Sequence, residues 1–204
     1  MDSEWSFRIA LAGLIVLFLP VGVYHRLKAA TGEPLRRRDE GNFVMIALRL
    51  SGLFGMMAIL TYLFDPRLLS WSQVGLPAGL RWAGLPLGLV AEAWTFWMFR
   101  SLGANLTDTV TVREHATLVT HGPYRWVRHP LYLGVLLIML ASSLLTANAL
   151  ILSFGIVAVA LLIVRSGTEE AKLEDRFGAP YRAYRSRTGF LFPKLHSSRR
   201  VDLR

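Results

Sequence analysis

The residues best suited to chemistry in this sequence lie in two stretches that flank its last long apolar block. The first stretch runs from 117 to 134 and reads TLVTHGPYRWVRHPLYLG. Gly122-Pro123 predicts a turn, and Pro130 suits the first residue of a helix, where its missing N–H costs nothing. His129 is therefore expected at the N-terminal end of a helix, at the water interface, with Tyr132 within one turn. Unpaired backbone N–H groups at such an end favour an anion such as a carboxylate.

The second stretch begins at Arg165, where the apolar block ends, and contains the pair Glu169-Glu170. Beyond it, bulky residues recur at spacings of four, four and three, which predicts one face of an amphipathic helix: Leu173, Phe177, Tyr181 and Tyr184. The other face is basic, with Lys172, Arg176, Arg182 and Arg185. Such a helix either lies on lipid headgroups or folds back over His129 and closes a pocket.

The elements that must position these residues are membrane-spanning helices. The chain has 204 residues, of which 53% are hydrophobic and only 18% charged, and its mean hydropathy is +0.40. A soluble domain of this size carries about 25% charged residues. Apolar blocks near 7–24, 43–64 and 82–99 each match the roughly 20 residues that cross a bilayer. We expect the first block to be retained, because its leader is acidic and lacks a cleavage site.

The last apolar block, 131–164, is too long for one crossing, since a helix of that length would reach roughly 50 Å. Thr146-Ala147-Asn148 is its polar interruption and predicts a tight turn between two helices. The sequence thus predicts an all-α integral membrane protein with five spans, in which 1–100 holds three spans and 101–204 holds a helical hairpin, a cytoplasmic cofactor-binding loop and the amphipathic tail helix. We expect a single membrane domain, 1–204.

The distribution of basic residues gives the expected orientation. Segments between spans carry five, two, four and no Lys/Arg in turn, and the tail from 165 carries ten. This alternation places the N-terminus outside and the C-terminus in the cytoplasm, and we expect a prokaryotic inner membrane. The formal charge of +9 then suits lipid headgroups, not nucleic acid. Arg49 and Glu92 fall at similar depth inside two spans and are a candidate buried pair.

Some chemistry is excluded or disfavoured. There is no cysteine, so a thiol nucleophile, a disulfide and a cysteine-bound metal are excluded. The spacing of His115, His121, His129 and Glu114 fits no strong ligand signature, and we expect no metal. Local readings of the candidate residues stay open: His129 as a helix cap, the glutamate pair as an acidic first turn, and Arg165 as a snorkelling anchor.

The two stretches together resemble a known family. The sequence is similar to the isoprenylcysteine carboxyl methyltransferase and phospholipid methyltransferase group of integral membrane methyltransferases. The similarity lies in a series of motifs: Gly-Pro-Tyr, then Arg-His-Pro-x-Tyr-x-Gly, then Glu-Glu, then Phe-Gly-x-x-Tyr-x-x-Tyr before Pro193. The resemblance covers 115–193. It implies S-adenosylmethionine as cofactor and a lipophilic, membrane-resident methyl acceptor.

The resemblance also implies site residues. By similarity, the adenosine side would be lined by Ala116, Thr117, Leu118, Val119 and Tyr124. The methionine end would be held by His129, Pro130, Leu131 and Tyr132, with Glu169 from the tail. Further cofactor contacts would be Gly122, Pro123, Arg128 and Glu170. Arg165 matches the position that faces the substrate carboxylate in isoprenylcysteine methyltransferases.

The reaction fits such a residue set, because methyl transfer from a sulfonium is an in-line displacement that depends on alignment and desolvation. A carboxylate acceptor needs no base, and Arg165 would position it. An amine acceptor, as in phospholipid headgroup N-methylation, would need Glu169, Glu170 or His129 as base. Two other functions stay open. One is an NADPH-dependent membrane reductase, because some sterol reductases resemble this group and have a similar C-terminal half. The other is a non-catalytic membrane interaction protein.

Overall fold

The protein folds as long helices arranged side by side. The computed structural model describes residues 3–29, 42–103 and 117–194. The α-helices of the described part are α1 (Ser3–Ala29), α2 (Asn42–Phe64), α3 (Ala78–Trp82), α4 (Gly84–Leu102), α5 (Pro130–Thr146), α6 (Ala149–Phe177) and α7 (Ala179–Arg187). Two 3₁₀ turns, η2 (Pro66–Ser72) and η4 (Gly122–Arg125), join them, and no strand forms in these ranges. The predicted all-α class is confirmed.

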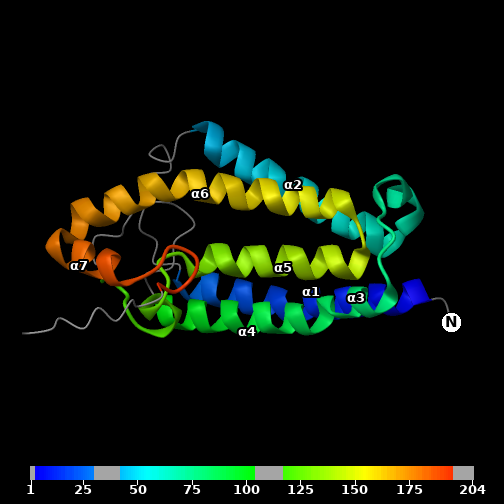
Figure 1. Ribbon diagram of the computed structural model, residues 1–204, viewed down its shortest axis with the longest axis horizontal. Helices are drawn as coiled ribbons and strands as arrows, with labels where there is room; N and C mark the ends of the chain where they lie inside the picture. The colour runs from blue at the N-terminus through cyan, green and yellow to red at the C-terminus, as the bar shows by residue number, and fades with distance from the viewer. Residues whose placement is uncertain (1–2, 30–41, 104–116, 195–204) are drawn as a thin grey trace, which may run out of the picture.

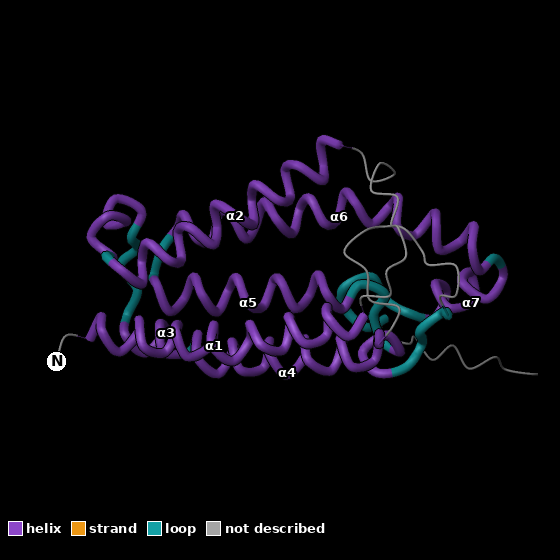
Figure 2. Tube along the Cα trace, turned by 180° about the vertical axis from the view of Figure 1, so that it is seen from behind, coloured by secondary structure: helices purple, strands orange, loops and turns teal. Residues whose placement is uncertain are grey.

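The long helices form three layers. α2 and α6 lie side by side on one face, α5 runs through the middle, and α1 and α4 cover the opposite face (Figures 1 and 2). α4 approaches α5 closely because glycines stand at their contacts: a Cβ at Gly134 would lie 2.8 Å from Thr95 Oγ1, and one at Gly84 2.6 Å from the Ala141 carbonyl oxygen. α7 turns back beside the end of α6, next to the start of α5. The central helix α5 therefore connects the two ends of the molecule.

Helices occupy all five positions where spans are predicted. Three described helices are long and apolar enough to cross a membrane, Glu4–His25, Phe43–Phe64 and Ala149–Phe177, and Pro130–Thr146 is a shorter apolar helix. α4 lies where the third span is predicted, although it is not among those three. The multi-pass membrane character is thus supported, while the number of five spans and their orientation stay predictions.

The predicted turn at Thr146-Ala147-Asn148 is confirmed. α5 ends at Thr146, Ala147 adopts a left-handed conformation with φ 49°, and α6 begins at Ala149. Asn148 is buried, and its side-chain oxygen accepts from the N–H groups of Leu150 and Ile151 at 3.0 and 3.3 Å. This N-cap satisfies two of the helix's unpaired donors, which fixes the start of α6.

The amphipathic tail helix is shorter than the pattern predicts. One continuous helix through Leu173 and Tyr184 is wrong, because α6 ends at Phe177 and α7 starts at Ala179. Gly178, with φ +57°, and Pro180 interrupt the helix between them. The buried face of α7 nevertheless consists of Tyr181 and Tyr184, as the spacing predicts.

The candidate pair inside the spans does not form. Arg49 is exposed on α2, while Glu92 is half-buried on α4. Both residues are described, and no ion pair joins them. The two helices belong to opposite faces of the molecule, which the sequence pattern of hydropathy alone does not reveal (Figure 1).

Candidate functional site

His129 marks the start of the candidate site. It occupies the N-cap position of α5, but its side chain makes no capping hydrogen bond, so the simple capping role does not hold. The side chain is covered by protein, since the residue is only 4% exposed, and its depth at the water interface stays a prediction. Its ring stacks on Tyr132 with centroids 4.7 Å apart and packs at 4.8 Å against Phe190. These two rings exclude water from the imidazole and restrict its orientation.

Glu170 from α6 ties His129 to two arginines. Its Oε1 lies 3.1 Å from His129 Nε2 and 2.7 Å from Arg128 Nε, while Oε2 lies 3.2 Å from Arg185 Nε. A carboxylate only accepts hydrogen bonds, so His129 Nε2 carries a hydrogen in this arrangement. Glu170 is 8% exposed, and a buried carboxylate requires this compensation by charge and hydrogen bonds.

Glu169 and Arg165 occupy the neighbouring face of α6. Tyr132 donates from its hydroxyl to Glu169 Oε2 at 2.7 Å, and His129 Nδ1 lies 4.0 Å from the same oxygen. The Glu169 side chain keeps 33% exposure. Arg165 is half-buried one helical turn earlier, and residues four apart share a helix face. The predicted residues of the two stretches, 37 to 41 positions apart, are therefore neighbours in space.

The segment 188–194, which follows α7 and is called the strap below, packs against the site from the C-terminal side. Arg128 N–H donates to the Gly189 carbonyl at 2.9 Å, His129 N–H to the Phe190 carbonyl at 3.2 Å, and Gly189 N–H to the Trp126 carbonyl at 2.9 Å. The strap leaves no room for a side chain at Gly189, where a Cβ would lie 1.6 Å from the Phe192 carbonyl oxygen. Backbone pairing thus fixes the segment that carries Arg128 and His129.

Tyr184 anchors α7 to the same segment. Its hydroxyl donates to the Tyr124 carbonyl at 2.8 Å, and burial raises the pKa of Tyr184 to about 12, so the group stays a donor at neutral pH. Burial, and next the charge of Glu169, raise the pKa of Tyr124 further. Burial and the charge of Glu170 likewise raise the pKa of Tyr181. All three phenols are neutral, and Tyr124 lies near the Glu169 carboxylate.

The remaining predicted residues fall around this centre. Gly122 and Pro123 form η4, where Gly122 has φ +60° and Pro123 is buried. Pro130 is buried, with its carbonyl bonded to Trp94 Nε1 at 2.8 Å, and Leu131 is exposed beside it. Thr117, Leu118 and Val119 lie in the chain that leads to η4, with Thr117 exposed and the other two half-buried. Their cofactor contacts stay predictions, and Ala116 lies outside the described residues.

Three neighbours of the candidate site were not predicted as site residues: Arg185, Thr188 and Phe190. Arg128 Nη1 donates to the Thr188 carbonyl at 2.7 Å, so the guanidinium is fixed by this carbonyl as well as by Glu170. Arg185 lay on the basic face of the predicted tail helix, and its position near a carboxylate depends on the break at Gly178. Phe190 carries no pattern that distinguishes it from an ordinary apolar residue.

This arrangement suits a cofactor with a cationic or hydroxyl-bearing end. Glu169 Oε1 bonds to no described side chain, whereas Oε2 is held by Tyr132. A fixed, partly exposed carboxylate oxygen accepts hydrogen bonds from an ammonium group or from ribose hydroxyls. The described residues contain no cluster of His, Asp and Glu able to hold a metal ion. Glu169, His129 and Tyr132 could hold the ammonium group or the ribose hydroxyls of S-adenosylmethionine, and this assignment stays a proposal.

The described residues define a helical protein of membrane type with a cluster of polar side chains at one end of its helices. Residues 84–175 match the model of the isoprenylcysteine carboxyl methyltransferase (ICMT) family. The matched segment includes His129, Glu169 and Glu170. The resemblance inferred from the motifs is thereby confirmed for this part of the chain.

Individual relatives match parts of the chain. The chain is 42% identical over 79 residues to methanethiol S-methyltransferase 2 of Bradyrhizobium diazoefficiens, covering 39% of this chain and 30% of that protein. It is 31% identical over 104 residues to protein-S-isoprenylcysteine O-methyltransferase A of Arabidopsis thaliana, covering 50% and 53%. A solved structure of the eukaryotic intramembrane Ras methyltransferase ICMT aligns at a TM-score of 0.49 with 24% identity, covering 75% of this chain and 53% of that one. The matches thus span about a third to about half of these relatives.

Proposed function

We propose that the protein is an S-adenosylmethionine-dependent methyltransferase whose acceptor is a lipophilic carboxylate in the membrane. The observation that carries the proposal is the meeting of His129 and Tyr132 with Glu169 and Glu170 at one end of the helices. The family match over residues 84–175 supports the same activity. In this arrangement the cofactor supplies an electrophilic methyl group, and the protein supplies alignment.

Each residue of the centre has a role that follows from its contacts. Glu169 binds the cofactor through the oxygen that Tyr132 does not occupy. Glu170 acts as a positioning residue, because it holds His129 and Arg128 in place and is itself buried. The rings of Tyr132 and Phe190 keep water from His129, and water would compete with the acceptor.

Arg165 is the proposed acceptor-binding residue. It stands one turn closer to the membrane-embedded part of α6 than Glu169, so an acceptor that enters from the bilayer reaches it first. A guanidinium binds a carboxylate through two parallel hydrogen bonds and aligns one oxygen for attack. A carboxylate is already ionised at neutral pH, so this reaction requires no general base.

A second candidate is thiol S-methylation. It is favoured by the 42% identity with methanethiol S-methyltransferase 2, which exceeds the 31% identity with the isoprenylcysteine enzyme. The nucleophile would then be a thiolate, and a guanidinium next to a thiol lowers its pKa. Arg165 serves this reaction through its charge, whereas it serves the carboxylate through bidentate geometry.

The test uses purified full-length protein with S-adenosylmethionine labelled in its methyl group. Four acceptors are compared: an S-farnesyl cysteine derivative, methanethiol, phosphatidylethanolamine and a fatty acid. We expect label in a base-labile ester of the farnesyl cysteine, and its loss in Arg165→Lys because one ammonium does not reproduce the fork geometry. Label in a thioether or an amine with no ester would replace the carboxylate.

Cofactor choice is tested separately by calorimetry. S-adenosylmethionine should bind to the wild type, and Glu169→Gln should weaken it by roughly tenfold through the loss of one charge-assisted hydrogen bond. Asp175→Asn, an exposed acid farther along α6, is the matched control and should leave binding unchanged. Binding of NADPH without S-adenosylmethionine would indicate a reductase, and binding of neither would indicate a non-catalytic protein.

A further inference from the structure

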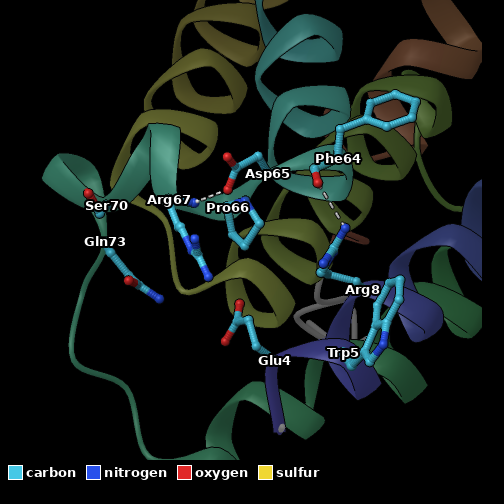
Figure 3. Close-up of a pocket in the computed structure, with 9 residues that line it drawn as sticks. All are labelled: Glu4, Trp5, Arg8, Phe64, Asp65, Pro66, Arg67, Ser70 and Gln73. Carbon is cyan, nitrogen blue, oxygen red and sulfur yellow. Dashed lines mark hydrogen bonds between the residues drawn. The ribbon is translucent and has the colours of Figure 1, made fainter.

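The end of the helices opposite the candidate site carries an open cavity that the proposed reaction does not use. It has a volume of about 760 Å³ and lies between the first turns of α1, the end of α2 and η2 (Figure 3). The Leu145 carbonyl, next to this end, lies 15 residues along α5 from Pro130, a distance of about 22 Å. A ligand in this cavity is therefore separate from the cofactor.

The cavity lies at the level of lipid headgroups. The candidate span Glu4–His25 begins at it, and the candidate span Phe43–Phe64 ends at it. Aromatic side chains around it are strongly exposed: Trp5 by 53%, Phe64 by 82% and Trp71 by 73%. Exposed tryptophans gather where the hydrocarbon meets the headgroups. This depth holds for either orientation of the chain.

Most charged groups around the cavity are already engaged. Glu4 accepts from Arg81 at 2.9 and 3.0 Å, and Asp65 Oδ1 accepts from the Arg67 backbone N–H at 3.0 Å. Arg8 donates to the carbonyls of Leu63 and Phe64, at 2.8 and 3.0 Å. Three guanidinium groups thus stand beside two carboxylates, which leaves an excess of positive charge.

Arg67 carries the positive charge in this excess that is available to a ligand. Its side chain is exposed and makes no hydrogen bond or ion pair with any residue that the structure describes. Figure 3 shows the guanidinium pointing into the space between Gln73 and Glu4. Gln73 adds an exposed amide on the same wall. A guanidinium and an amide at headgroup depth form a donor set for a phosphate oxygen.

We propose that this cavity binds the phosphodiester of a membrane phospholipid. Arg67 and Gln73 bind the phosphate, and the exposed rings of Trp5 and Phe64 lie beside the upper part of the acyl chains. Because the cavity is walled by α1 on one side and α2 with η2 on the other, the bound lipid connects these helices and stabilises the fold.

The test measures the melting temperature of the purified full chain in detergent during titration with short-chain phosphatidylglycerol. Wild type should show a saturable rise. Arg67→Gln should need a roughly tenfold higher lipid concentration for half of that rise, because one charge-assisted contact to phosphate is lost. Without lipid this variant should melt like wild type, since Arg67 is exposed. Arg187→Gln, an exposed arginine at the other end, should titrate like wild type.

Further arms identify the ligand. Short-chain phosphatidylethanolamine should act comparably to phosphatidylglycerol, because the two share the phosphodiester. Diacylglycerol of the same chain length should give no saturable rise, and saturation with it would overturn the phosphate assignment. Inorganic phosphate binding as tightly as the lipid would overturn the lipid assignment. An Arg67→Gln titration equal to wild type would overturn the site itself.

Discussion

Two networks of arginine and glutamate stand at the two ends of α5, and they differ in what they leave available. At the Leu145 end, Arg81 donates to both Glu4 oxygens, to the Leu145 carbonyl and to the Tyr62 hydroxyl. At the Pro130 end, Arg128 and Arg185 hold Glu170, while the adjacent Glu169 keeps a partly exposed carboxylate. At the Leu145 end every atom of the ion pair is engaged within the fold, whereas at the Pro130 end one carboxylate keeps an oxygen that the proposed function assigns to the cofactor.

The two networks differ in whether every carboxylate oxygen already has a partner, and not in the kinds of residue that form them. The Arg81 network joins α1, α2, α3 and α5, and its guanidinium also packs 3.8 Å from the centre of the Phe7 ring. In the Glu170 network both oxygens of Glu170 have partners, which fixes His129 in place. His129 then lies beside Glu169, whose Oε1 bonds to no described side chain. A saturated network contributes to stability, whereas a network next to an unsaturated group positions that group for a ligand.

The largest expected effect is on the free energy of unfolding, through the Arg81 network. Arg81→Ala should lower the free energy of unfolding by roughly 3–5 kcal/mol, because Glu4 loses its counter-charge in a partly buried position. Thermal or denaturant unfolding in detergent measures it, with Arg67→Ala on the exposed side as control. Methyl transfer per folded molecule should stay unchanged. A loss below about 1 kcal/mol would show that the network contributes little.

The next effect should be on catalysis. Glu170→Gln should reduce kcat/KM by roughly 100-fold, because an uncharged amide neither compensates Arg128 and Arg185 nor fixes His129 in place, and small misplacements are costly. Initial rates at varied cofactor concentration measure it. Glu174→Gln, which removes a more exposed partner of Arg185, is the matched control. Equal losses in both variants would assign the effect to the anchoring of α7.

A smaller effect on stability should separate η4 from the α6–α7 junction. Gly122→Ala should cost about 2 kcal/mol, because a residue at φ +60° is strained and its Cβ would lie 2.8 Å from Ser101 Cβ. Gly178→Ala has a similar φ of +57° but open space around the new Cβ, so it should cost about 1 kcal/mol. Unfolding of both variants gives the difference, and equal costs would show that Ser101 moves aside freely.

The smallest effect should come from the strap. Phe190→Leu should weaken cofactor binding by roughly threefold to fivefold, since one aromatic contact to His129 is lost. Calorimetric titration measures it. Phe192→Leu, 64% exposed on the same strap, should bind like wild type. Unchanged binding in Phe190→Leu would leave Tyr132 as the ring that orients His129.

Much of the fold was predictable from local patterns. Hydropathy located the long helices, and the polar triplet at Thr146 located the hairpin, because Asn148 is a good N-cap and the apolar block exceeds one crossing. The break in the tail was missed although Gly178 and Pro180 are a helix-stop signal. The periodic bulky residues on both sides concealed it, since Leu173 and Phe177 on α6 are half-buried and Tyr181 and Tyr184 on α7 are buried.

The sequence by itself determined the membrane class and the family resemblance, and it named most of the candidate site residues, because these depend on residue types at short spacing. Only the tertiary structure decided that Glu170 pairs with Arg128 and His129, and that Glu169 accepts a hydrogen bond from the Tyr132 hydroxyl. It also decided that Arg49 and Glu92 stay apart. Hydropathy and spacing report the environment of each residue but not its partner. The partners become defined only when α6, α7 and the strap pack against the start of α5.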